Sequence, residues 1–235
     1  MVRKLMVCGL TVAVCAAGAV AAFAASEATT FSVKHTSKAA DSSAGITFKI
    51  AFGDPDAASG VPSGLKNFKI KLHKGTKIDG GGAPQCTASN EELMKDGAKA
   101  CPAATRIGSG TAAATSAAGQ TVKVDAAIFN ERVSGKNAFL FVFLLNDAYV
   151  TDFDATVKGN TISSEGLSGA LPGDFVVTEF NGTIGKHSKG RGKRKHDLIT
   201  TPPTCPKSKK WTNTATFVFQ DGATDTGSST SACKR

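Results

Sequence analysis

A run of seven apolar residues, Phe139–Leu145, constrains the fold of this chain more than any other stretch. Three of the seven are Phe, and Asn137 and Asn146 bracket the run. A short run that is rich in Phe and bounded by turn formers is typical of a β-strand covered on both faces. It is too short to cross a bilayer as a helix, which needs about 20 residues. We therefore expect a β-domain with this strand near its middle.

Alternation of apolar and polar residues recurs along the chain. It is clear in Ile46–Phe52, Phe68–Leu72, Val122–Ile128 and Trp211–Phe219. A period of two is the pattern of strands with one buried face. The composition agrees with this, because 14 Phe and 25 Gly supply strand formers and turn residues. The predicted fold class is all-β, an antiparallel β-sandwich with one short disulfide-stapled helix.

The helix is predicted between two cysteines, Cys86 and Cys101. Ser89 and Glu92 have the spacing of a capping box, and Gly97 ends the run. A helix of about two turns is unstable alone. A disulfide across its ends would hold it to the sheet.

The N-terminus has the parts of a secretory signal peptide. Arg3 and Lys4 precede the uncharged apolar stretch Leu5–Phe23, and Ala22–Ala24 fits the small-residue cleavage pattern. We expect cleavage after Ala24. The alternative is a retained anchor, because the stretch is nearly long enough to span a bilayer.

This assignment divides the chain into three parts. Residues 1–24 are the signal peptide, residues 25–44 are a flexible N-terminal segment in which a first strand could begin, and residues 45–235 are a single β-sandwich domain. Loss of Arg3 and Lys4 with the signal peptide lowers the formal net charge from +9 to +7. Since no second long apolar run follows, we expect no membrane span after cleavage and a secreted or envelope-associated protein.

Four cysteines remain after cleavage, namely Cys86, Cys101, Cys205 and Cys233. An even count in a secreted chain predicts two disulfides, with three possible connectivities. Local sequence favours Cys86–Cys101 and Cys205–Cys233, because each pair brackets one compact unit. A metal site is disfavoured, since the spacings are wide and no His lies near these cysteines in the sequence.

A basic stretch lies between residues 185 and 196 and is the candidate anion-binding site. Its cations are Lys186, Lys189, Arg191, Lys193, Arg194 and Lys195. A solvated hairpin tip is the simpler interpretation, because Gly, Ser and Lys suit exposed turns. The functional alternative is a patch for an anionic cell-wall polymer or glycan. Nucleic acid is disfavoured, since no aromatic residue is interleaved to stack on bases.

No motif in the chain predicts a catalytic residue, a cofactor or a metal. Asp152 and Asp154 share one face of a predicted strand and could act as a carboxylate pair in glycan cleavage. Two outward acids that balance nearby lysines explain them more simply.

Several ordered segments resemble a family of small secreted all-β proteins that is common in high-GC Gram-positive and related soil bacteria. The segments are Phe68–Ile78, Pro84–Cys86, Cys101-Pro102, Ile107–Gly110, Phe175–Phe180 and Thr201–Pro206, followed by Trp211 and Phe217. The resemblance covers roughly residues 45–235. It implies a signal peptide, two local disulfides and an all-β fold, and it carries no activity, cofactor or catalytic residue. A Lys-rich turn before the Pro-Pro-Thr-Cys segment is a feature of that family.

The sequence therefore predicts a secreted, non-enzymatic β-sandwich with a structural or binding role, and an anionic cell-envelope polymer as the candidate partner. The alternative is a secreted glycan-active hydrolase or lyase.

Overall fold

The computed structural model describes residues 27–54, 60–167, 170–171 and 174–234. The predicted signal peptide, residues 1–24, lies outside this part of the chain. The strands of the main sheet are β1 (Glu27–His35), β2 (Ile46–Gly53), β3 (Leu65–Lys71), β5 (Arg106–Thr115), β6 (Thr121–Val133), β7 (Lys136–Leu145), β8 (Ala148–Lys158), β9 (Thr161–Ser164), β10 (Ala170–Leu171), β11 (Phe175–Ile184), β15 (Lys210–Phe219) and β16 (Thr224–Ala232).

Two short strand pairs and five helical turns complete the described fold. The pairs are β4 (Lys77–Ile78) with β14 (Ile199–Thr200), and β12 (Ser188–Lys189) with β13 (His196–Asp197). The helix is α1 (Asn90–Asp96), and the 3-10 turns are η1 (Gly80–Gly82), η2 (Gly97–Ala100), η3 (Ala103–Thr105) and η4 (Gly192–Arg194).

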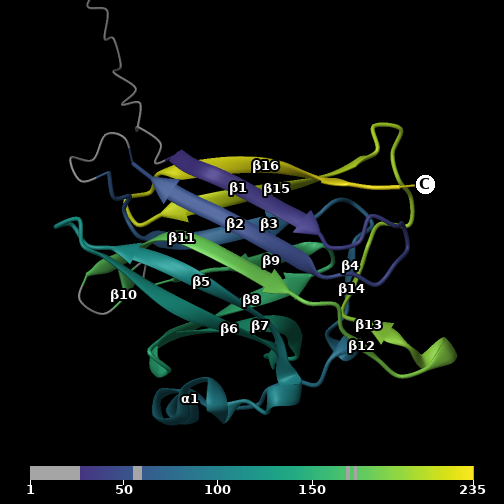
Figure 1. Cartoon of the computed structure of the whole chain (residues 1–235), viewed down its shortest axis with the longest axis horizontal. Helices are drawn as coiled ribbons and strands as arrows, with labels where there is room; N and C mark the ends of the chain where they lie inside the picture. The colour runs from purple at the N-terminus through teal and green to yellow at the C-terminus, as the bar shows by residue number, and fades with distance from the viewer. Residues whose placement is uncertain (1–26, 55–59, 168–169, 172–173, 235) are drawn as a thin grey trace, which may run out of the picture.

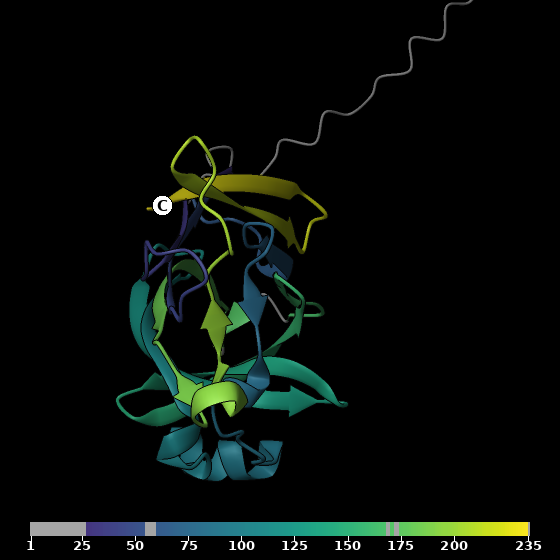
Figure 2. The same ribbon diagram turned by 90° about the vertical axis from the view of Figure 1, so that its right-hand side faces the viewer.

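One continuous antiparallel sheet forms the body of the protein, which confirms the predicted all-β class (Figure 1). Its order is β1-β2-β11-β5-β6-β7-β8-β9-β3-β15-β16, with β10 beside β11. The two layers expected of a sandwich are opposite walls of this sheet, which curls into a near-barrel (Figure 2). Because each strand along this path is antiparallel to the next, the first and the last strand, β1 and β16, run in the same direction.

Side chains from β16 close the seam between these two strands. The Ser229 hydroxyl accepts from the Val33 amide at 2.9 Å and donates to the Val33 carbonyl at 3.1 Å. Ser231 accepts from the His35 amide at 3.0 Å. The hydroxyls thus satisfy backbone groups that an edge strand would leave unpaired.

The central strand β7 is covered on both faces, as predicted. Phe139, Phe141 and Phe143 point into the barrel and belong to its core. On the outer face, Leu140 and Val142 pack in a second cluster with Leu93 of α1 and with the Cys86–Cys101 disulfide. The predicted capping box of α1 is present, since Ser89 accepts from the Glu92 amide and Glu92 accepts from the Ser89 amide.

The structure differs from the prediction of a flexible segment at residues 25–44. β1 occupies residues 27–35 and pairs along its length with β2. Val33 is fully buried in the core. Residues 27–35 of the segment are therefore part of the barrel wall.

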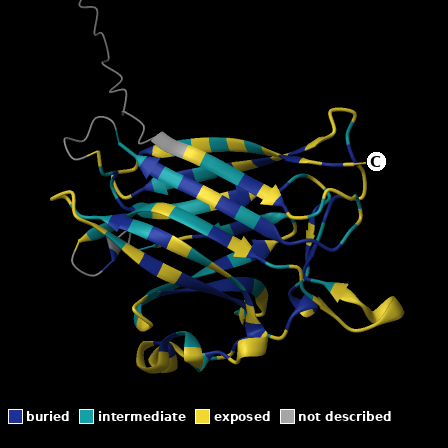
Figure 3. Ribbon diagram, in the orientation of Figure 1, coloured by how far each residue is buried: buried dark blue, intermediate teal, exposed yellow. Residues whose placement is uncertain are grey.

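The connections between strands alternate between two ends of the barrel. At one end, which we call the closed end, the chain crosses the barrel (Figure 2) and fills it with Leu72, Ile78, Leu198 and Ile199, all of them buried. Buried and exposed blocks alternate along the strands of the barrel wall (Figure 3). The buried Asn130 supports this plug by donating to the Gly80 and Ala83 carbonyls, both at 2.9 Å. We call the opposite end the mouth.

Candidate ligand cavity

The barrel holds a cavity of about 470 Å³ in its mouth half. Apolar side chains from β2, β3, β7, β8, β9, β10, β11 and β15 form most of its wall. Eight of the lining residues are aromatic: Phe48, Phe52, Phe68, Phe141, Phe143, Phe153, Phe180 and Phe217. The plug residues at the closed end are not part of this lining. The barrel is therefore filled at one end and hollow at the other.

The rings in the cavity wall form a connected cluster. Phe141 stacks on Phe153 with centroids 4.8 Å apart, and Phe143 lies 5.8 Å from the same ring. Phe180 meets Phe141 edge-on at 5.8 Å, and Phe68 meets Phe153 edge-on at 6.0 Å. Such contacts fix the rings relative to one another. The wall is thus a preformed apolar surface.

Three of these rings keep part of their surface exposed although they point into the barrel. Phe68, Phe153 and Phe180 are only partly buried, whereas Phe139, deeper in the same core, is 1% exposed. Alternation along their strands would predict full burial in a filled barrel. Their exposure follows from the hollow that they face.

The rim of the cavity is held in place on the β3 side. The Leu167 amide donates to the Lys66 carbonyl, and the Gly166 amide donates to the Asn67 side chain, each at 2.9 Å. Ser164 is a polar residue of the lining, but its hydroxyl donates to the Asp154 carbonyl at 2.6 Å. The Ser164 proton is therefore used within the wall, and Thr151 and Glu165 are further polar residues of a mainly apolar lining.

The two predicted candidate carboxylates, Asp152 and Asp154, border the cavity, but their side chains belong to the other face of β8. They lie opposite Val142 and Leu140 of β7, which pack beneath α1. Strand alternation places the carboxylates on this outer face. There the Tyr149 hydroxyl donates to Asp152.

A third acid, Glu131, joins this outer group from β6, and no motif in the sequence singles it out. Burial, and then the neighbouring Asp154 and Asp152, raise the pKa of Glu131 to about 8. Burial and the Asp152 carboxylate raise the pKa of Tyr149 to about 12. A protonated Glu131 can share its proton with Asp154. Glu131 is not part of the cavity lining, so the three acids do not converge in the cavity. The hydrolase or lyase alternative stays a prediction.

The predicted basic stretch forms a separate hairpin at the closed end. β12, η4 and β13 project beyond the sheet, and Lys186, Lys189, Arg191, Lys193, Arg194 and Lys195 are exposed (Figure 1). The structure brings these cations near one another and away from the cavity, which lies in the other half of the barrel.

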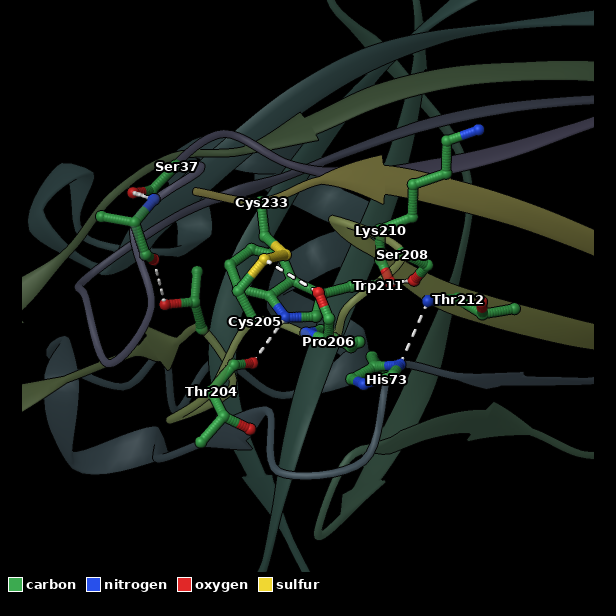
Figure 4. Close-up of a disulfide and its surroundings, with 12 residues drawn as sticks. Ser37, His73, Thr204, Cys205, Pro206, Ser208, Lys210, Trp211, Thr212 and Cys233 are labelled. Atoms are coloured by element: carbon green, nitrogen blue, oxygen red, sulfur yellow. Dashed lines mark hydrogen bonds between the residues drawn. A yellow bond between two sulfur atoms is a disulfide. The ribbon is translucent and has the colours of Figure 1, made fainter. Parts of the chain in front are cut away.

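Both predicted disulfides are present. Cys86 is bonded to Cys101 across 15 residues, and Cys205 is bonded to Cys233 across 28 residues. The second bridge lies beside the buried Trp211, whose indole donates to the Thr204 carbonyl at 3.0 Å (Figure 4). Two disulfides are compatible with an extracellular protein.

No group of three or more His, Cys, Asp or Glu within the described residues has a geometry that would hold a metal ion. None of the helices in that part of the chain has the length and apolar character needed to cross a membrane. Searches against protein-family models, curated proteins and solved structures find no match to the chain. The resemblance to the family of secreted all-β proteins therefore stays a prediction.

Proposed function

We propose that this chain is a secreted, non-enzymatic binding protein that holds a small, neutral, apolar molecule in the barrel cavity. The observation that carries the proposal is the hollow, aromatic-lined mouth half of an otherwise packed barrel. Its volume of about 470 Å³ falls in the range of roughly 300–1,000 Å³ that is usual for small-molecule sites. The mouths of β-barrels are common places for such sites.

The apolar wall of the cavity supports an apolar occupant. Because the cavity opens at the mouth, water or a ligand can enter it. A folded barrel can keep such a space if water or a ligand enters it, and an apolar wall favours an apolar ligand over water.

The charge around the mouth favours a neutral ligand. Five connections lie at this end, and their described residues are 54, 60–64, 116–120, 146–147, 165–167, 170–171, 174 and 220–223. These residues include five Asp or Glu and no Lys or Arg. An anionic head group, such as that of a fatty acid, would meet like charge there. A hydrocarbon chain or ring system with a neutral polar end fits both the wall and the mouth.

The predicted signal peptide and the two disulfides support a secreted protein. Export also fits the proposed role, since a neutral apolar molecule is poorly soluble in water and needs a protein to hold it outside the cell.

The test is titration of the mature protein with N-phenyl-1-naphthylamine, a neutral dye whose fluorescence rises in apolar surroundings. We expect saturable binding with one dye per chain. Dodecanol should displace the dye at concentrations at least about tenfold lower than dodecanoate, a difference of roughly 1.4 kcal/mol. Equal displacement would contradict the neutral ligand class.

A matched pair of variants locates the dye. Val177→Trp fills the cavity from its wall, whereas Val218→Trp adds the same bulk to the outer face of β15, because the flanking Phe217 and Phe219 point inward. The first variant should bind at least about tenfold more weakly and the second as wild type. If the Val177→Trp protein is folded by circular dichroism and binds normally, the dye is elsewhere and the proposal fails.

A further inference from the structure

The β12–β13 hairpin is a cationic projection whose two ends are attached to the barrel. Leu198, directly after β13, is fully buried, and its amide donates to the His187 carbonyl at 3.0 Å. The His187 ring lies 3.0 Å from the Ile107 carbonyl. These contacts join both ends of the hairpin to the barrel.

The acidic side chains of this region already have partners at the foot of the hairpin. Asp79 pairs with His196 at 2.9 Å, and Asp197 pairs with Lys195 at 2.9 Å and accepts from the Ser188 hydroxyl. Lys195–Asp197 is a salt bridge, and Asp79–His196 becomes one when His196 is protonated. Lys195 is therefore partly neutralised.

The remaining hairpin cations have no carboxylate partner within the described chain. They are Lys186, Lys189, Arg191, Lys193 and Arg194, and all are exposed. Their backbone is ordered at the tip, where the Arg194 amide donates to the Arg191 carbonyl at 3.1 Å. The tip thus presents several unneutralised charges from a defined turn.

The cations continue beyond the hairpin along the closed end. The connection from β11 to β15, together with the first residue of β15, spans residues 185–210 and contains nine Lys or Arg and one acid. The connections at the mouth carry acids and no Lys or Arg. Charge is therefore separated along the barrel axis, with the cationic face at the end opposite the cavity.

We propose that the closed end, led by this hairpin, docks on a flexible anionic polymer of the cell envelope, a chain with a phosphate or carboxylate on each repeat. Such a partner needs no shaped pocket, because closely spaced charges on both sides supply the attraction. Docking at the closed end leaves the mouth open to solvent. The proposal does not depend on which molecule occupies the cavity.

Other polyanions fit the hairpin less well. From residue 185 to residue 197 the sequence contains no Phe, Tyr or Trp, so nucleic-acid bases would find no ring to stack on. An anionic membrane surface usually also takes up apolar side chains. The one Leu that follows, Leu198, is buried in the barrel. Charge without exposed apolar surface favours a water-soluble polymer chain.

The test measures binding of the intact mature protein to inorganic polyphosphate and to polygalacturonate across a range of salt concentrations. The variant Arg191→Ser/Lys193→Ser/Arg194→Ser removes three unpaired tip cations. At low salt it should bind at least about tenfold more weakly, and the slope of log K against log salt should fall by about 2, roughly 0.7 for each lost contact. Loss with one polymer alone would identify phosphate or carboxylate as the recognised group.

The matched control is Lys66→Ser/Lys69→Ser/Lys123→Ser, which removes the same charge from exposed positions on β3 and β6. It should bind nearly as wild type. An equal loss of polymer affinity in the two triple variants would show that only net charge matters and would contradict the proposal. Unchanged polymer affinity in the hairpin variant would also contradict it. Tighter binding to single-stranded DNA or to vesicles with 30% phosphatidylglycerol would reassign the partner. The cavity variant Val177→Trp should bind polyphosphate as the wild type does. Failure of the cavity proposal can therefore be told apart from failure of the docking proposal.

Discussion

Acidification should weaken the barrel through one histidine at its seam. His35 ends β1, is 7% exposed, and lies edge-on against Trp211 at 5.3 Å. Its ring nitrogens lie 3.4 Å from the Ser231 hydroxyl and 3.2 Å from the Thr76 hydroxyl. Burial, with a smaller contribution from His73, lowers the pKa of His35 from 6.5 to about 4. The neutral ring is therefore part of the folded state.

The sign of the effect follows from proton counting. Between pH 6.5 and about 4, the unfolded chain binds a proton at His35 and the folded chain does not. Stability is complete above pH 6.5 and is lost as the pH falls through this window. The shift from 6.5 to about 4 corresponds to roughly 3 kcal/mol in all, of which about 2 kcal/mol is lost between pH 7.5 and 5.

The assay is urea unfolding, followed by the fluorescence of Trp211, of the wild type and His35→Gln at pH 7.5 and pH 5. Glu131 titrates in the same range with the opposite sign, so the informative quantity is the difference in unfolding free energy between the two proteins. The stability advantage of the wild type over His35→Gln should shrink by about 2 kcal/mol on acidification. His196→Gln, on the exposed hairpin, is the control and should leave the pH dependence within about 1 kcal/mol of wild type. A constant difference between wild type and His35→Gln would refute the reasoning.

Three further changes test other parts of the structure. Glu131→Gln should raise the free energy of unfolding at pH 8 by roughly 1 kcal/mol after allowance for solvent screening. In the wild type, ionisation of Glu131 should lower the free energy of unfolding as the pH rises from 4.5 to about 8, and the variant should lack this decrease. Urea unfolding at both ends of that range measures the difference. Gly227→Ala should cost about 1–3 kcal/mol, because its Cβ would lie 2.7 Å from the Phe31 ring across the seam; an unchanged melting temperature would contradict this contact. Removal of the Cys205–Cys233 bridge by a double Ala substitution should cost roughly 3–4 kcal/mol for a loop of 28 residues, and hydrogen exchange should show the loss first in β16.

The elements of this fold could be predicted because their signals are local. Ile46–Phe52 alternates within one strand, and the capping box of Ser89 and Glu92 lies within one helical turn. Each disulfide joins residues that bracket one unit, so proximity in sequence identified the correct pairs. The cations of residues 185–196 were likewise visible as a run.

The cavity and the seam could not be predicted, because they depend on strand order. Phe68, Phe153 and Phe180 come from β3, β8 and β11, and each looks like an ordinary core residue in its own strand. Whether facing rings fill a barrel or surround a hollow depends on the separation of the walls. Ser229 likewise has no sequence signal for its role, since it bonds to Val33, 196 residues earlier in the chain.

The alternation of connections explains how one chain can build two chemically different ends. In this barrel successive strands run in opposite directions, so every second connection reaches the same end. Acids in the connections after β2, β7, β9 and β15 therefore collect at the mouth, and the bases after β11 collect at the closed end. Segments that plug the barrel also come from closed-end connections, such as those with Ile78 and Leu198. Packing and positive charge are thus concentrated where the barrel is filled, which leaves the opposite end free to stay hollow and open.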